Sequence, residues 1–117
     1  MDQANRIIYV EFQAIDLEKT KAFFTNVFGW KFTDYGPDYT SFEDGQIAGG
    51  FARSDKRASL AKGSALVVIF HPKLEDTLKK VVAHGGKVTQ EIFAYPGGRR
   101  FHFTEPSGNE LSVCSDP

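Results

Sequence analysis

The sequence is poor in cysteine, in long apolar runs and in surplus charge of either sign. Its one cysteine, Cys114, cannot form a disulfide within the chain, which favours a reducing compartment. The opening residues, MDQANRIIYVEF, carry an acid at position 2 and no apolar run long enough for a signal peptide or a membrane helix. We therefore expect a cytoplasmic protein with no membrane partner.

Charge is balanced, with 14 lysines and arginines against 15 acidic residues. Proteins that bind nucleic acid through their general charge usually carry a basic surplus, so we expect no nucleic-acid partner. Phenylalanine, by contrast, is plentiful: eleven in 117 residues supply enough buried aromatic surface for a real core. The length suits one domain over residues 1–117.

The first half of the chain predicts one strand, one helix and three further strands. RIIYVEFQA alternates in polarity, and an apolar stripe of helical period follows from Leu17 to Phe28, with Asp16 as N-cap and Gly29 as the stop. The segments WKFTDY, YTSFED and QIAGGFA then read as short strands separated by turns.

The second half repeats this order. SALVVIF reads as a strand, Pro72 suits the first turn of a helix whose stripe runs from Leu74 to Val82, and KVTQEIFA, RRFHFTE and NELSVC read as strands. A shift of 57 positions pairs Val10 with Val67. The same shift pairs Leu17 with Leu74 and Gly29 with Gly86.

An internal duplication therefore predicts an α+β fold of two tandem βαβββ modules that form a curved mixed sheet. We place module one at residues 6–53, a linker at 54–63 and module two at 64–115.

Strand periodicity assigns the two faces of the expected sheet. Apolar pairs such as Val10/Phe12 and Leu111/Val113 suit the face under the helices. The opposite face would form a concave wall that mixes apolar and polar side chains, as small-molecule pockets do. Its expected members are Tyr9, Glu11, Gln13, Ile47, Gly49, Phe51, Leu66, Val68, Phe70, Arg100, His102, Thr104, Glu110, Ser112 and Cys114.

Two longer motifs resemble a known superfamily. DLEKTKAFFTNVFGW in the first half and EPSGNELSV near the end resemble the vicinal oxygen chelate superfamily, over about Arg6 to Ser115. That superfamily includes glyoxalase I, extradiol dioxygenases, fosfomycin-resistance enzymes and bleomycin-binding resistance proteins. The resemblance implies a glyoxalase/bleomycin resistance-like fold and a homodimer, and leaves open whether modules pair within or between chains.

The resemblance also implies where a divalent metal would bind. Metal-dependent members use His or Glu at four positions, which fall here on Tyr9, Gly49, Leu66 and Ser112. Divalent-metal sites generally need two or three imidazole or carboxylate ligands. We therefore expect a metal-free member with no cofactor, which counts against glyoxalase I and ring-cleaving dioxygenase activity.

Three polar residues of the wall are candidates for chemistry. Glu11 could act as a general base or hydrogen-bond acceptor, or could pair with an arginine such as Arg100 or lie at a dimer contact. His102 could transfer a proton or be a hydrogen-bonded pocket residue without catalytic duty, and Arg100 could hold an anion. The expected ligand-binding set is Tyr9, Gln13, Phe51, Leu66, Val68, Phe70, Arg100 and Ser112.

The first functional hypothesis is metal-free binding of a small, partly apolar molecule in the concave pocket. The alternative is a lyase, isomerase or transferase, glyoxalase-related if an enzyme at all, that uses Glu11 and His102 in acid–base chemistry or as ligands of a displaced metal site. A third possibility is a structural or regulatory subunit that keeps the fold without a small ligand.

Overall fold

The computed structural model describes residues 3–117 and contains the βαβββ order twice. Module one consists of β1 (Tyr9–Ala14), α1 (Leu17–Phe28), β2 (Lys31–Asp34), β3 (Tyr39–Glu43) and β4 (Ala48–Arg53). The linker holds a short 3-10 helix (Leu60–Lys62). Module two consists of β5 (Val67–Phe70), α2 (Leu74–Ala83), β6 (Lys87–Tyr95), β7 (Gly98–Thr104) and β8 (Glu110–Ser115). The expected α+β fold of two tandem modules is confirmed.

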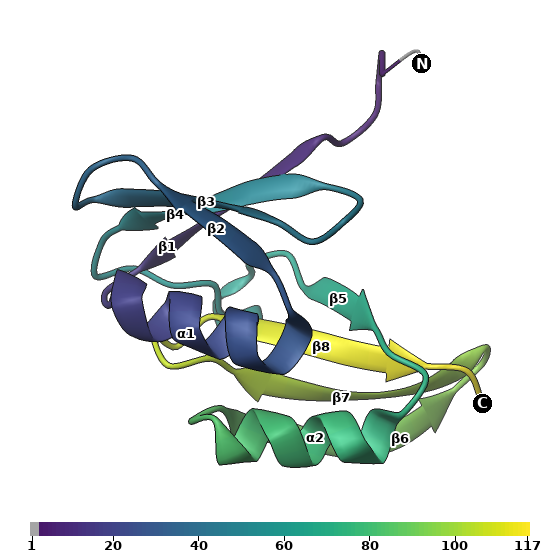
Figure 1. The fold of residues 1–117 in the computed structure, drawn as a ribbon. Helices are drawn as coiled ribbons and strands as arrows, with labels where there is room; N and C mark the ends of the chain where they lie inside the picture. The colour runs from purple at the N-terminus through teal and green to yellow at the C-terminus, as the bar shows by residue number, and fades with distance from the viewer. Residues whose placement is uncertain (1–2) are drawn as a thin grey trace.

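Each module forms its own four-stranded mixed sheet (Figure 1). The strand orders are β1-β4-β3-β2 and β5-β8-β7-β6, with β1–β4 and β5–β8 parallel and the other pairs antiparallel. One chain thus carries two sheets, and β1 and β5 are each the edge strand of one of them.

The helices begin and end close to where local chemistry predicts. The Asp16 carboxylate accepts a hydrogen bond from the Lys19 amide at 3.0 Å, and Gly29 ends α1 with a positive φ of 73°. The expectation for Pro72 is wrong, because α2 begins at Leu74 with Lys73 as its N-cap and Pro72 precedes both.

The apolar faces of both sheets share one core. On α1, the Phe24 ring lies 5.5 Å from Phe51 of module one, and the Phe23 ring lies 5.7 Å from Phe103 of module two. Because α1 contacts the apolar face of each sheet, the opposite faces turn away from this shared core. We call these the outer faces of module one and module two. The buried apolar side chains are Phe12, Ala14, Leu17, Phe23, Phe24, Val27, Trp30, Phe42, Phe51, Leu74, Val81, Phe101, Phe103, Leu111 and Val113.

A buried polar cluster fixes the modules against each other. The Glu105 carboxylate, 2 % exposed, accepts hydrogen bonds from the Thr20 hydroxyl at 2.9 Å, the Asn109 amide at 3.0 Å and the Ser107 backbone N–H. Burial raises the pKa of this carboxyl above its usual range, and the three hydrogen bonds oppose that shift. Asn109 also donates to the carbonyl of Gln13 at 2.7 Å, so the β7–β8 turn is tied to the end of β1.

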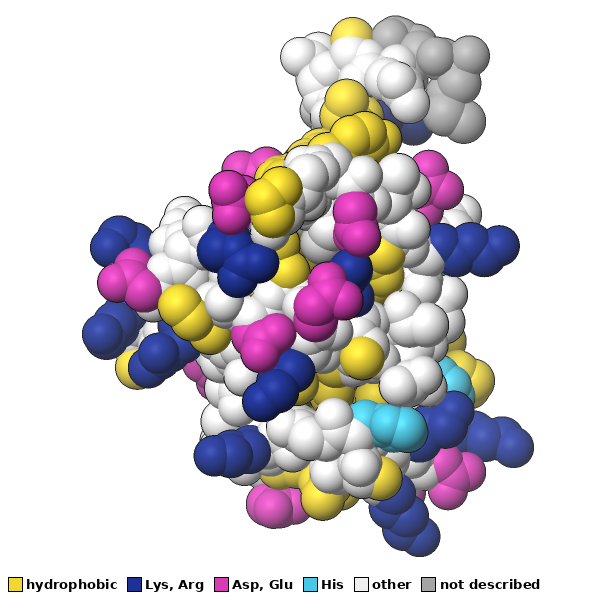
Figure 2. All heavy atoms as spheres, turned by 60° about the vertical axis from the view of Figure 1, so that its left-hand side comes forward, with side chains coloured by type: hydrophobic (Ala, Val, Ile, Leu, Met, Phe, Trp, Pro, Cys, Tyr) yellow, Lys and Arg dark blue, Asp and Glu magenta, His cyan; other side chains and the backbone are white. Residues whose placement is uncertain are grey.

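The surface carries charges of both signs. Figure 2 shows lysines and arginines interspersed with acidic side chains over the visible face, as the near-zero net charge leads one to expect. Across residues 3–117, neither helix has the length and apolarity needed to cross a bilayer.

Candidate functional site

The outer face of module one is built on β1 and β4. In their parallel pairing Tyr9 lies beside Ala48, Glu11 beside Gly50 and Gln13 beside Ala52. All three of these β1 side chains are exposed, whereas Phe12 between them is buried in the core. The predicted placement of Tyr9, Glu11 and Gln13 opposite the helix is therefore what the structure shows.

The prediction for β4 is wrong by one residue. Gly49 pairs with Val10 and Phe51 with Phe12, so both lie on the apolar face. Phe51 is fully buried and stacks on the Phe12 ring at 5.2 Å, so it is a core residue and does not line the outer face. The outer face carries Gly50 in place of Gly49.

A hydrogen-bonded chain of hydroxyls and a carboxylate covers Gly50. The Tyr39 hydroxyl, from β3, contacts the Tyr9 hydroxyl and donates to the Glu11 carboxylate at 2.9 Å. A Cβ at Gly50 would lie 2.1 Å from the Tyr39 hydroxyl oxygen, so any other residue there would displace that hydroxyl. Burial raises the pKa of Tyr39 above its usual range, and the hydrogen bonds that its hydroxyl makes with the Tyr9 hydroxyl and the Glu11 carboxylate raise it further.

Tyr39 was missed by the sequence reasoning, although a signal was present. The alternation in YTSFED puts Tyr39 and Ser41 on one face and Thr40 and Phe42 on the other, and Thr40 and Phe42 are buried. Within the chain, Glu11 finds its partner in Tyr39 and not in Arg100.

The outer face of module two is built on β5, β8 and β7. Ser112 lies between Val68 and His102, and Cys114 between Phe70 and Arg100. These side chains share the face opposite Leu111 and Val113, as predicted. Leu66 is half-buried and lies just before β5, outside the strand.

Three buried polar atoms on this face have no hydrogen-bond partner among the described residues: Arg100 Nε, His102 Nε2 and Ser112 Oγ. Aromatic rings from β6 surround two of these groups. The Arg100 guanidinium carbon lies 5.4 Å from the centre of the Phe93 ring and 5.2 Å from that of Tyr95. Phe93 also contacts His102 edge-on at 5.8 Å.

Phe93 and Tyr95 were not predicted for this site. The β6–β7 pairing shifts register twice, between Val88 and Gln90 and between Gln90 and Phe93, so simple alternation along β6 does not place its side chains.

The surroundings of His102 disfavour its charged form. Burial lowers the pKa of His102 below its usual value, the positive charge of Arg100 lowers it further, and Glu110 acts in the opposite sense. A neutral imidazole has one donor and one acceptor nitrogen, so in this form His102 can donate one hydrogen bond and accept another.

Glu11 and His102 do not share one wall within a chain. They belong to different sheets, and each lies on the outer face of its own module. Acid–base cooperation between them, or a shared metal, would need two modules placed outer face to outer face.

The residues at the expected metal positions do not fit a divalent metal. With the β4 correction the four positions hold Tyr9, Gly50, Leu66 and Ser112. Their side chains offer a phenol at Tyr9, an alkyl group at Leu66 and a hydroxyl at Ser112, and Gly50 has no side chain. Over residues 3–117, no three His, Cys, Asp or Glu side chains group closely enough to hold an ion. These four positions supply no imidazole or carboxylate, the ligands that a divalent metal site generally needs.

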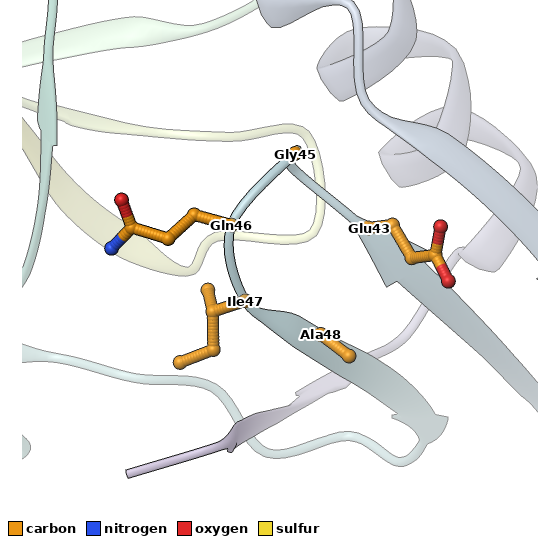
Figure 3. A pocket seen from close by; sticks show the side chains of 5 residues that line it. All are labelled: Glu43, Gly45, Gln46, Ile47 and Ala48. Carbon is orange, nitrogen blue, oxygen red and sulfur yellow. The ribbon is translucent and has the colours of Figure 1, made fainter. Parts of the chain in front are cut away.

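Two hollows lie elsewhere on the chain. One, of about 280 Å³, covers the β3–β4 turn, where the side chains of Glu43, Gln46 and Ile47 point in different directions (Figure 3). Another, of about 560 Å³, runs along the edge of β5 and is lined mainly by apolar residues such as Phe28 and Ile69. Neither hollow contains Glu11, Arg100, His102 or Ser112, so the outer faces remain the candidate site.

Comparison with known proteins assigns most of the chain to one family. Residues 6–113 match the family model described as Glyoxalase/Bleomycin resistance protein/Dioxygenase superfamily. A search of curated proteins finds no match.

Solved structures share the fold at low sequence identity. A glyoxalase-related enzyme from Fulvimarina pelagi superposes with a TM-score of 0.79 at 17% identity, over 97% of this chain and 89% of that one. The genomically encoded fosfomycin resistance protein FosX from Listeria monocytogenes gives 0.78 at 15%, over 95% and 93%. A glyoxalase/bleomycin resistance protein/dioxygenase family enzyme from Burkholderia phytofirmans PsJN gives 0.78 at 14%, over 93% and 97%. At such identities the likeness concerns the fold alone.

Proposed function

The chain belongs to the Glyoxalase/Bleomycin resistance protein/Dioxygenase superfamily, and we propose that it binds a small, partly apolar molecule without the usual divalent metal. The binding site would lie between the outer face of module one in one copy and the outer face of module two in a second copy. The observation that carries the proposal is that each outer face combines exposed apolar side chains with a small polar cluster, next to an unpaired edge strand.

The edge strands supply the argument for a homodimer. Ile7 and Ile8, which lead into β1, are 81 % and 55 % exposed, and on β5 Val68 and Phe70 are 42 % and 55 % exposed. In Figure 1 the segment before β1 extends away from the body of the molecule. Unpaired strand edges that carry exposed apolar side chains are surfaces that proteins usually cover. Placing β1 of one copy beside β5 of another would cover both.

In such a dimer each pocket would have two different walls. One wall would present Tyr9, Tyr39 and Glu11, and the other Val68, Arg100 and Ser112. Apolar surface with a few fixed polar groups is typical of sites for small organic molecules.

Oligomeric state tests this arrangement. We expect a dimer by analytical ultracentrifugation at micromolar concentration, and a monomer for Ile8→Lys, since a charge at the buried edge would oppose association. Val82→Lys is the matched control, because Val82 is an apolar residue of α2 with nearly the same exposure, 53 %. A wild-type monomer, or an Ile8→Lys variant that dimerises like wild type, would refute the interface.

Metal content tests the second part of the proposal. We expect no stoichiometric Zn, Ni, Mn or Fe in the purified protein and no fall in melting temperature with EDTA. Stoichiometric metal whose removal lowers the melting temperature would contradict metal-free binding, because a ligand of the folded state stabilises it.

An enzymatic function is the second candidate, and the position of His102 favours it. An imidazole can act as a general base, His102 is 7 % exposed on the outer face of module two, and Glu11 of the facing module would lie across the same pocket. Any lyase, isomerase or transferase turnover found in the dimer should then fall sharply in both Glu11→Gln and His102→Ala. Full turnover in both variants would remove these residues from the chemistry.

The cytoplasmic location expected from the sequence is part of the same proposal. Cys114 is a free, half-buried thiol on the outer face of module two, and a reducing compartment would keep it so.

A further inference from the structure

The unpartnered polar atoms of module two point to the chemical class of the ligand. We infer that Arg100, His102 and Ser112 form an oxyanion site, which binds the acid group of a small organic acid with an aromatic or otherwise apolar body. This inference rests on the outer-face pocket proposed above and specifies what enters it.

The first argument is hydrogen bonding. His102 is 7 % exposed and Ser112 is fully buried, yet His102 Nε2, Ser112 Oγ and Arg100 Nε have no partner among the described residues. Folded proteins rarely leave buried polar atoms unsatisfied, and three such atoms on one sheet face indicate a missing partner that can accept from all of them. An oxyanion has the lone pairs to accept an N–H from arginine, an N–H from a neutral histidine and an O–H from serine.

The second argument is charge. Arg100 forms no ion pair within residues 3–117, whereas its neighbour Arg99, on the opposite face of β7, pairs with Glu75 at 2.5 Å. The carboxylate of Glu110, on the same face as Arg100, already accepts from the Leu60 backbone N–H at 2.9 Å and from the Thr89 hydroxyl at 3.2 Å. The positive charge of Arg100 is therefore available to an anion from outside the chain.

The third argument is shape and surroundings. The Arg100 guanidinium lies over the Phe93 ring and over the Tyr95 ring, at 5.4 and 5.2 Å from their centres, and these two contacts restrict its direction before a ligand arrives. Val68 and Phe70 lie beside Ser112 and Cys114 and expose apolar surface next to the donors. A ligand with an acid group on an apolar body matches this arrangement, in which hydrogen-bond donors lie next to exposed apolar side chains.

Carboxylates and phosphonates are both oxyanions that can accept hydrogen bonds from these donors. Charged and neutral probes of similar shape distinguish an anionic ligand from a neutral one. We would measure binding of benzoate, phenylphosphonate and the neutral isostere benzamide to the full-length protein by calorimetry and by melting temperature. We expect one of the two acids to bind at least about tenfold more tightly than benzamide, the ratio typical of a charge-assisted hydrogen bond.

Arg100→Gln should weaken binding of that acid at least about tenfold. Arg99→Gln is the matched control, since it removes the same charge from the adjacent position on the other face, and should leave affinity unchanged. Ser112→Ala, which removes one buried hydroxyl, should also weaken binding of the acid. This variant takes the place of Arg100→Gln in the test if Arg100→Gln fails to fold.

Cys114 provides a local readout, because it lies directly opposite Arg100 in the β7–β8 pair. Bound acid should slow its modification by a thiol reagent. Equal binding of benzamide and the acids, an unaffected Arg100→Gln, or unchanged Cys114 reactivity would overturn the oxyanion site while leaving a neutral pocket possible. If no aromatic probe binds and the protein is monomeric, the proposed function itself fails.

Discussion

At the scale of residues, two buried polar clusters differ in how fully they are hydrogen bonded. Glu105 accepts from Thr20, Ser107 and Asn109, all within the chain. Arg100 and His102, with Ser112, leave three polar atoms without a partner among the described residues. A satisfied cluster stabilises the fold, whereas an unsatisfied one lowers stability and offers donors to a ligand.

Loss of the Glu105 carboxylate should therefore destabilise the fold strongly. Glu105→Ala leaves the buried Ser107 backbone N–H and one N–H of the Asn109 amide without their acceptor, and it removes one of the two partners of the Thr20 hydroxyl. We therefore expect a loss of about 3 kcal/mol in the free energy of unfolding from urea titration. Glu18→Ala is the control, because Glu18 is an exposed helix carboxylate paired with Lys21 and should change stability by less than about 0.5 kcal/mol. Similar losses in both variants would refute the structural role of Glu105.

His102 predicts a pH dependence with a definite sign. Its pKa in the folded protein is below the ordinary value of about 6.5, so the unfolded chain takes up a proton that the folded chain resists. The contribution of His102 to stability is thus present above about pH 6.5 and is lost as the pH falls toward its folded pKa. We expect wild type to lose stability relative to His102→Gln between about pH 7 and 5. A difference that is constant over that range would contradict the burial of the imidazole.

Residue alternation predicted much of this site correctly. The apolar residues Phe101 and Phe103 flank His102 in β7, and Leu111 and Val113 flank Ser112 in β8. Because successive side chains of a strand point to opposite faces, burial of the apolar residues places His102 and Ser112 on the outer face. Phe93 could not be predicted, because the irregularities of β6 depend on its pairing with β7 and leave no mark in the sequence.

At the scale of elements, local sequence predicts where the helices begin and end. It does not always predict the register of the strands. α1 has an apolar stripe of helical period, an N-cap at Asp16 and a stop at Gly29, all visible in the sequence. The β4 region, IAGGFA, has no polar residue to mark the outer face, so its register is set by contacts with β1 and β3. For that reason Phe51 was assigned to the wrong face.

The two glycines of β4 test this register directly. A Cβ at Gly49 would lie 2.3 Å from both the Phe42 ring and the Val10 carbonyl oxygen, whereas a Cβ at Gly50 would meet the hydroxyl ends of Tyr39 and Tyr9. Gly49→Ala should cost about 3 kcal/mol or more, because backbone and a packed ring must shift. Gly50→Ala should cost less, about 1 kcal/mol, because the hydroxyl ends can move aside. The reverse order in thermal or urea unfolding would place Gly49 on the outer face.

At the scale of the whole molecule, the sequence predicted two modules but not their relative placement. The internal repeat specifies the elements of each module, while contacts such as Asn109 to the carbonyl of Gln13 decide how the modules pack. In one chain they share an apolar core and turn their outer faces away from it. A pocket that uses both faces therefore needs a second copy.

The balance of surface charge agrees with the proposal that a ligand is recognised by a few groups inside a pocket. Acidic and basic side chains are interspersed on the face in Figure 2, and the net charge is −1, so that face has no surplus of one charge that would attract a ligand. Selection would instead depend on the few groups inside the pocket.

Subunit complementation tests the shared site most directly. Tyr9→Ala alters the wall from module one and Arg100→Gln the wall from module two, and each homodimer should lose binding of the acid probe. In a mixed dimer of the two variants, one pocket combines the intact module one of one chain with the intact module two of the other. Calorimetry should then recover one bound probe per mixed dimer, half the wild-type number. No recovery in a confirmed mixed dimer would show that each site lies within a single chain and would contradict the account.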